Sequence, residues 1–331
     1  MTNALLHPFA PAAKPTSDYI NIVRGAGSLV YDDTGMDYVD GLGSLWYCQV
    51  GHGRAEIIDA VADQMRRIEA YNIFDPFTNE PADRVAEMVV ERSPFPDGRV
   101  FLGCSGSEAV DTAIKIARQA MQRRGQTERQ VVVRRTNGYH GTNFGGTSAQ
   151  GIAPNREGWG DLVPHFIEVP HDDLEAAAQV FADQGDRIAA IITEPVQGAG
   201  GVFPPVDGYL EGLRRLCDQH GALLIFDEVI CGFGRTGEWF GAQTFGVTPD
   251  LITFAKAVTS GYQPLSGVIL SRDLSAEFEE PGFLLRTGYT YSGHPAACAA
   301  GIANIELMEA EDLVVRGRHV GGQIRDGLEA L

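Results

Sequence analysis

The sequence predicts an α/β protein built on a mainly parallel sheet, with helices covering both faces of that sheet. Short apolar runs alternate with helical or long polar segments from Arg99 onward, and each run is continuously apolar, as in strands buried on both faces. The length of 331 residues exceeds what one hydrophobic core usually supports, so we expect two packed domains. The six runs are Val100–Leu102, Val131–Val133, His165–Val169, Ile188–Ile192, Leu223–Phe226 and Leu251–Phe254.

The N-terminal part of the chain has a different pattern. Residues 18–41 alternate in hydropathy around the turn Asp32–Gly35, which predicts a small antiparallel meander forming a separate lobe. Helical patterns follow from Arg54 to about Tyr71 and over Pro81–Glu91, the second opened by a proline in its first turn. The chain ends in a helical pattern from Asp312 to Leu331, and it has no internal repeat or low-complexity tract.

Composition narrows the classes of partner. With 26 basic and 44 acidic residues the net charge is −18, which disfavours nucleic acids and anionic lipid surfaces. The segment Met1–Lys14 lacks a basic region followed by an apolar one, and no stretch reaches membrane-spanning length, so we expect neither secretion nor a membrane. The five cysteines are scattered without C-x-x-C spacing, which predicts no disulfide framework, no metal site and a cytoplasmic location.

Two of the predicted strands each lead into a reactive side chain. Asp227 follows the run Ala222–Phe226, and Lys256 follows Asp250–Ala255. The carboxyl ends of parallel strands meet at one edge of a sheet, so the two side chains are expected to converge. A lysine amine can hold an aldehyde as a Schiff base, and a carboxylate can keep a pyridine nitrogen protonated. The pair therefore predicts a pyridoxal 5'-phosphate (PLP) site, although a strand-end lysine alone usually reaches solvent.

A phosphate site is predicted where the first apolar run meets a strongly helical segment. The stretch Leu102–Ala109 ends a strand in small residues, and a helix is expected from Ala109 to Arg124. Ser105 and Glu108 have capping-box spacing, so Gly106 and Ser107 would present N–H groups and a hydroxyl to an anion. In isolation, an ordinary capped helix is the favoured explanation of this motif. The G-x-G-x-x-G fingerprint and the P-loop ending are both missing, which disfavours a nicotinamide dehydrogenase and a P-loop enzyme.

Two further strand ends carry candidate side chains. Tyr139 follows the run Val131–Val133 in a glycine-rich loop and can stack on a flat heteroaromatic ring, although a turn tyrosine is an equal alternative. The neighbouring His140 is read as structural, because nothing near it in the sequence completes a metal set. Glu194 ends another strand before a proline, where bonding to the neighbouring backbone competes with a direct cofactor role.

Taken together, these motifs resemble the class III, fold-type I PLP-dependent aminotransferases, particularly the omega or amine–pyruvate transaminase branch, and the resemblance covers nearly the whole chain. It implies a phosphate cup at Gly106 and Ser107, a ring-stacking Tyr139, a strand-end Glu194, and Asp227 with Val229 as pyridine partner and ring support. It also implies that Lys256 is the Schiff-base lysine. Two implied residues lie outside these motifs: Trp46 in the substrate pocket, together with Tyr139, and Thr290 reaching the phosphate of a neighbouring subunit in a homodimer.

The resemblance also implies a division of the chain and a reaction. Residues 1–53 would begin a small α+β domain, 54–305 would form the PLP-binding large domain, and 306–331 would begin a C-terminal part that is truncated here. The expected reaction moves an amino group from an amine or omega-amino acid to a keto acid, with pyruvate favoured, by a ping-pong mechanism through Lys256. A PLP-dependent aminomutase, a decarboxylating aminotransferase, and a truncated fold that binds cofactor without turnover remain as alternatives.

Overall fold

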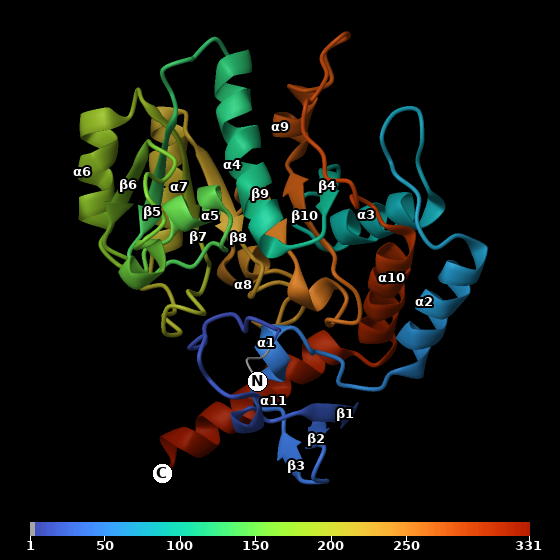
Figure 1. Cartoon of the computed structure of the whole chain (residues 1–331). Helices are drawn as coiled ribbons and strands as arrows, with labels where there is room; N and C mark the ends of the chain where they lie inside the picture. The colour runs from blue at the N-terminus through green and yellow to red at the C-terminus, as the bar shows by residue number, and fades with distance from the viewer. Residues whose placement is uncertain (1–3) are drawn as a thin grey trace.

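The computed structural model describes residues 4–331 and contains a seven-stranded sheet at its centre (Figure 1). The strand order is β4-β10-β9-β8-β7-β5-β6, and all strands are parallel except β10, which pairs antiparallel with both β4 and β9. This confirms the predicted α/β fold with a mainly parallel sheet. Its strands are β4 (Arg99–Gly103), β5 (Val131–Arg135), β6 (Phe166–Val169), β7 (Ile188–Thr193), β8 (Leu223–Asp227), β9 (Leu251–Phe254) and β10 (Ser266–Leu270).

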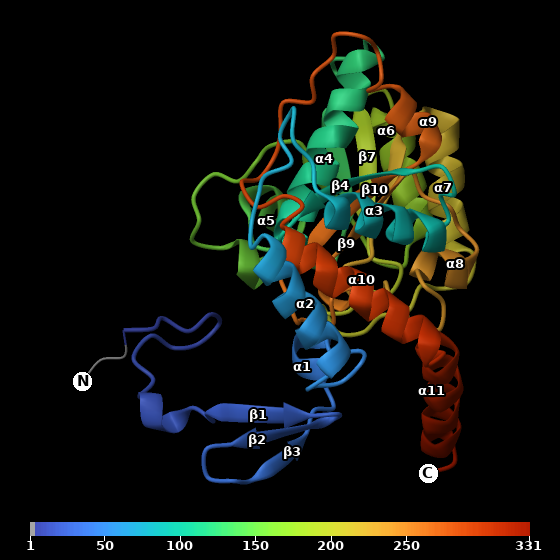
Figure 2. The ribbon, with the colours of Figure 1, turned by 90° about the vertical axis from the view of Figure 1, so that its right-hand side faces the viewer.

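Helices cover both faces of this sheet, and a separate apolar core fills each interface (Figure 2). On one face α4 packs over the central strands, and on the other face α7 packs against β8. Residues of β8 alternate between the two cores, as do Ala190–Ile192 of β7, because successive side chains of a strand point to opposite faces. The helices on this part are α4 (Gly106–Arg123), α5 (Phe144–Ala149), α6 (Leu174–Gln184), α7 (Tyr209–His220), α8 (Gly241–Phe245) and α9 (Arg272–Ala276).

The N-terminal meander stands apart from the large sheet, as predicted (Figure 2). Its strands are antiparallel and comprise β1 (Ile22–Ala26), β2 (Leu29–Asp32) and β3 (Asp37–Val39). The turn between β2 and β3 is held by Asp32, whose Oδ1 accepts the N–H groups of Thr34 (2.9 Å) and Met36 (3.0 Å). Its Oδ2 accepts the hydroxyl of Tyr38 at 2.8 Å, so one carboxylate fixes the whole turn.

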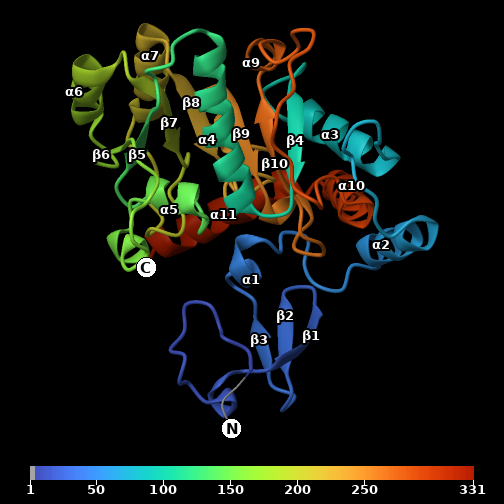
Figure 3. The same cartoon turned by 45° about the horizontal axis from the view of Figure 1, so that its top comes forward.

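Four longer helices lie beside the β4 edge of the sheet and below it (Figure 3). They are α2 (Ala55–Arg67), α3 (Glu80–Arg92), α10 (Pro295–Ala310) and α11 (Leu313–Glu329). The predicted helices correspond to α2, α3 and α11, although α2 ends four residues before Tyr71. The helix α10 runs without interruption across residue 305, and the proposed domain boundaries stay predictions. Within residues 4–331 no helix combines the length and apolarity needed to cross a membrane.

Candidate active site

One small cavity lies at the carboxyl end of the parallel strands. It collects seven of the nine candidate residues, although these are spread over 150 positions of the sequence. Asp227 ends β8, and Lys256 follows β9 at the start of the short 3-10 helix η3 (Lys256–Val258). The convergence predicted from sheet topology is therefore present. The candidate residues that line the cavity are Gly106, Ser107, Tyr139, Glu194, Asp227, Val229 and Lys256.

Lys256 has the environment of a reactive amine. Its backbone adopts a positive φ of 51°, a conformation that a side-chain-bearing residue rarely takes and that turns the chain sharply after β9. Burial lowers the pKa of the Lys256 amine, while the carboxylates of Asp227 and Glu194 oppose that shift. A lowered pKa leaves more of the lysine as neutral amine near neutral pH, which is the form that acts as a nucleophile or a base.

Asp227 is held by three neighbours, and one of them is a residue that the sequence did not assign to the site. Its Oδ1 accepts Val229 N–H at 3.2 Å and the Thr253 hydroxyl at 2.9 Å. Its Oδ2 lies 2.7 Å from Nδ1 of His140, and the two side chains are only 3% and 1% exposed. The interpretation of His140 as unconnected to the chemistry is therefore incomplete, since it also lines the cavity.

The orphaned atom of His140 indicates its tautomer. Its Nε2 is buried and has no hydrogen-bond partner. An N–H at that position would be unsatisfied, so a ring that donates from Nδ1 to Asp227 and keeps a bare Nε2 costs less. Donation from Nδ1 thus fixes the orientation of the Asp227 carboxylate. This arrangement suits a carboxylate that must face a cationic group in the cavity.

The N-terminus of α4 opens into the same cavity. Ser105 caps the helix by accepting Glu108 N–H at 3.2 Å, but Glu108 accepts the N–H of Cys104 at 2.7 Å instead of that of Ser105. The predicted capping box is therefore only half formed. Ser107 Oγ accepts Thr142 N–H at 3.0 Å and keeps its own proton available for an anion. The first turn of an 18-residue helix thus presents N–H groups and a hydroxyl at a positive helix end.

Glu194 positions the loop that carries Tyr139. Its two oxygens accept the N–H groups of Tyr139 and Gly198, both at 2.9 Å, which is the backbone-bonding alternative considered from the sequence. Burial raises its pKa to about 7. Arg135, which is 1% exposed, supports the same strand end by donating to the Thr193 hydroxyl (2.6 Å) and to the Glu194 carbonyl (3.2 Å). Arg135 has no local sequence signature that indicates this role.

Trp46 and Thr290 are not among the residues that line the cavity. Trp46 is half-buried in the short turn α1 (Gly43–Trp46), where Ser44 and Trp46 both have positive φ. Thr290 is exposed in the turn before α10. The neighbouring Tyr289 ties this turn to α4, since its hydroxyl lies 2.9 Å from Thr112 Oγ1 and donates to the Glu108 carbonyl at 3.0 Å. The roles expected of Trp46 and Thr290 stay predictions.

The residues that line the cavity fit PLP on the chemistry of their donors. The anion site matches the phosphate, and the lysine amine matches the aldehyde. The aromatic and aliphatic side chains match the two ring faces, and the buried carboxylate matches the pyridine nitrogen. Gly106 supports this assignment, because a Cβ at this position would lie 2.9 Å from Cγ1 of Val229. There is thus no room for a side chain at position 106 between the N-terminus of α4 and Val229.

Comparisons with known proteins agree with this geometry. The sequence profile of the family described as "Aminotransferase class-III" matches residues 10–331. The chain is 37% identical over 350 residues to the beta-alanine–pyruvate aminotransferase of Pseudomonas aeruginosa, covering 98% of this chain and 77% of that protein. It is 39% identical over 317 residues to the omega-amino acid–pyruvate aminotransferase of Pseudomonas putida, covering 88% and 70%.

Solved structures show the same similarity. An amine transaminase from an uncultivated Pseudomonas species, determined in its PLP-bound form, superposes with a TM-score of 0.91 at 36% sequence identity. The match covers 97% of this chain and 78% of that one. The similarity to these relatives and to this solved structure therefore covers most of the present chain.

Proposed function

This chain belongs to the class III aminotransferases, which are PLP-dependent enzymes, and from that premise we propose that it moves an amino group from an amine or omega-amino acid to pyruvate. Its relatives carry beta-alanine–pyruvate, omega-amino acid–pyruvate and putrescine–pyruvate aminotransferase as their names, so pyruvate recurs as the acceptor while the donor varies. The observation that carries the proposal is the convergence of Lys256 and Asp227 on one cavity at the sheet edge.

We propose the following division of binding roles. The amide N–H groups at Gly106 and Ser107, with the Ser107 hydroxyl, would hold the cofactor phosphate at the N-terminus of α4. Tyr139 and Val229 would contact the two faces of the ring, and Asp227 would hold the proton on the ring nitrogen. When bound, PLP supplies an electron sink for the negative charge that forms at the substrate carbon after proton removal.

The chain's own residues supply the proton transfers. Lys256 would hold the cofactor before the donor amine arrives, and its free amine would then serve as the general base that takes the proton from the donor carbon. The lowered pKa of Lys256 favours the neutral form of this amine, and the same nitrogen could return the proton on the cofactor side. The Asp227 carboxylate, fixed by His140 and Thr253, would stabilise positive charge on the ring nitrogen.

We propose a homodimer in the cytoplasm as the working form. Thr290 is exposed and lies outside the cavity of its own chain, as expected of a residue that reaches a neighbouring active site. Phe144 and Trp159 are also exposed, and they line a second pocket at the surface. Thr142 lines this pocket too, and its N–H donates to the Ser107 hydroxyl at the proposed phosphate site. A subunit that covers them would bury apolar surface.

All five cysteines are free thiols, which favours a reducing compartment.

The proposed reaction is tested with donor and acceptor added in turn. Without pyruvate, beta-alanine or putrescine should change the cofactor absorbance of the purified enzyme in a single turnover, and pyruvate should then restore it. With both substrates present, alanine should accumulate in equal amount to the donor consumed. Release of carbon dioxide would instead identify a decarboxylating enzyme, and an isomerised donor without alanine would identify an aminomutase. A coloured enzyme that stays inert with every donor would contradict the proposal.

Replacing Gly106 by alanine should weaken cofactor binding by about tenfold, because the added Cβ would lie 2.9 Å from Val229 and force the two walls apart. Titration of the apoenzyme with PLP, followed by absorbance, measures the change. Gly321→Ala is a matched control, since that position lies in α11 with no atom within 4 Å of an added Cβ. Equal PLP affinity in the Gly106 and Gly321 variants would remove Gly106 from the site.

A further inference from the structure

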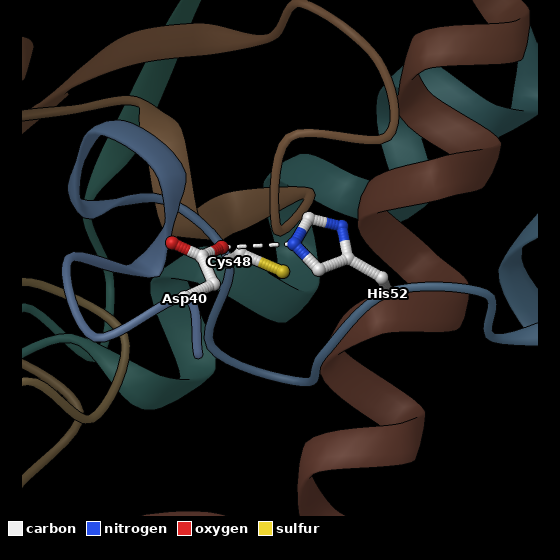
Figure 4. Close-up of side chains that lie close together, drawn as sticks. All are labelled: Asp40, Cys48 and His52. Atoms are coloured by element: carbon white, nitrogen blue, oxygen red, sulfur yellow. Dashed lines mark hydrogen bonds and ion pairs between the residues drawn. The ribbon is translucent and has the colours of Figure 1, made fainter. Parts of the chain in front are cut away.

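Three side chains of different chemistry meet below the active site, where the N-terminal meander joins the main body (Figure 4). They are Asp40, which directly follows β3, Cys48 after the α1 turn, and His52 in the loop before α2. One ligand-type atom from each side chain lies within 4.8 Å of the other two. All three side chains are partly buried, and within residues 4–331 they form the one group of this kind.

Hydrogen bonds fix the orientation of the carboxylate in this group. Asp40 Oδ1 accepts Ser44 N–H at 2.7 Å, and Oδ2 accepts the Ser44 hydroxyl at 2.9 Å. Oδ2 also lies 2.8 Å from Nε2 of His52 (Figure 4). Ligands held by neighbouring groups in this way are typical of metal centres, because their orientation is set before the cation arrives.

The backbone around His52 is fixed as well. His52 and Gly27 exchange two backbone hydrogen bonds of 2.8 and 2.9 Å, which attach this loop to the hairpin between β1 and β2. A side chain at position 25 would come within 2.7 Å of the His52 ring, so Gly25 leaves the space that the imidazole occupies. Two of the three candidate ligands are therefore held in place without help from an ion.

We propose that Asp40 Oδ2, Cys48 Sγ and His52 Nε2 form a binding site for a thiophilic divalent cation of the Zn²⁺ class, with water as the fourth ligand. Carboxylate, thiolate and imidazole are the ligand types that Zn²⁺ takes, at about 2.0 to 2.3 Å. Tetrahedral geometry at these lengths puts the donor atoms roughly 3.3 to 3.8 Å apart. The cluster reaches this arrangement if the 2.8 Å contact between Asp40 and His52 opens by roughly half an ångström and the Cys48 sulfur, which lies within 4.8 Å of both atoms, comes to about 3.5 Å from each.

The binding step balances in protons. Burial and the nearby carboxylate of Asp40 raise the pKa of the Cys48 thiol, so the thiol is protonated before the cation arrives. Coordination replaces the S–H bond with a bond from sulfur to the metal and releases one proton to solvent. It also replaces the hydrogen bond between Asp40 and His52: the proton on Nε2 moves through solvent to Nδ1, so the ring stays neutral and the lone pair of Nε2 binds the cation. The Ser44 hydrogen bonds to Asp40 remain.

A purely structural hydrogen bond between Asp40 and His52, joining the meander to the main body, would account for two of the three side chains without a metal. It does not account for the position of the Cys48 sulfur. In Figure 4 this sulfur lies beside the contact between the carboxylate and the ring. The cation would close a loop of the chain from Asp40 to His52, and this loop includes Trp46. The site is separate from the PLP cavity, since none of its three side chains lines that cavity.

The test uses PLP-saturated holoenzyme loaded with one equivalent of Zn²⁺. X-ray absorption at the zinc edge should show one sulfur at about 2.3 Å among nitrogen and oxygen ligands at about 2.0 to 2.2 Å. Competition with a chromophoric chelator should give one site per chain, with affinity at least about tenfold weaker in Cys48→Ser and His52→Gln. At the same concentration, Zn²⁺ should also raise the Tm of the wild type by more than that of Cys48→Ser.

Cys104→Ser is the matched thiol control, because Cys104 is also half-buried and burial also raises its pKa, but it lies outside the cluster. Its zinc affinity should equal that of the wild type. A sulfur-free coordination shell, equal affinity in Cys48→Ser, or no zinc binding by the wild type would each overturn the proposal. Cys48→Ser changes one atom, so its result decides the matter even if His52→Gln fails to fold.

Discussion

Replacing Lys256 by alanine should reduce kcat for amino-group transfer by about 10⁴-fold or more, since this one amine is proposed both to hold the cofactor and to move the proton. The variant should still bind PLP through the α4 N-terminus and Asp227, because these groups do not depend on the lysine. Single-turnover and steady-state assays with beta-alanine and pyruvate measure the loss.

Lys115 provides the control for this substitution. The chain contains three lysines, Lys14, Lys115 and Lys256, and Lys115 lies on α4, where its amine contacts the Thr287 hydroxyl and does not line the cavity. Lys115→Ala should keep a kcat close to that of the wild type. Wild-type turnover by Lys256→Ala would refute the catalytic assignment outright.

Replacing Asp227 by asparagine should lower kcat by about 10²- to 10³-fold while leaving the fold intact. Asparagine keeps the shape of the side chain and can still accept the hydrogen bond from His140, but it removes the charge that would keep the ring nitrogen protonated. Stopped-flow measurement of the donor half-reaction should show the defect directly. PLP affinity should also fall, because the cation on the ring loses its partner.

The adjacent Glu228 distinguishes a charge effect from general damage to this strand end. Glu228 is 1% exposed and accepts N–H groups of Gly241 and Ala242 at the start of α8, and it does not line the cavity. Glu228→Gln should therefore lower Tm while kcat stays near the wild-type value. If both variants lose only stability, or if Asp227→Asn retains wild-type kcat, the pyridine-partner role of Asp227 is wrong.

The sheet could be predicted well wherever strand and helix alternate, and poorly where they do not. Five of the six predicted apolar runs lie wholly within strands, and the sixth, His165–Val169, begins one residue before β6. Strands buried on both faces are apolar along their length, which is why such runs identify them. The seventh strand, β10 (Ser266–Leu270), was not predicted. It is antiparallel, lies between β4 and β9, and follows β9 without an intervening long helix, so it breaks the alternation that identified the others.

The site could be predicted where each residue has a local signature, and not where its role depends on a distant partner. Asp227 and Lys256 follow apolar strands, and sheet topology then brings them together. His140 has no local signature, because its partner Asp227 is 87 positions away. The same holds for Arg135, whose bonds reach Thr193 and Glu194 across neighbouring strands. The Asp40, Cys48 and His52 cluster lacks the usual spacing of metal ligands and becomes visible only in three dimensions.

The most direct test of the central claim is to find the lysine that carries the cofactor. The PLP-loaded enzyme is reduced with borohydride, digested and mapped by mass spectrometry, with Lys14 and Lys115 as internal controls in the same chain. The account predicts one cofactor-modified residue, Lys256. Modification of Lys14 or Lys115 in its place, or a Lys256 peptide that stays unmodified in the coloured enzyme, would contradict it.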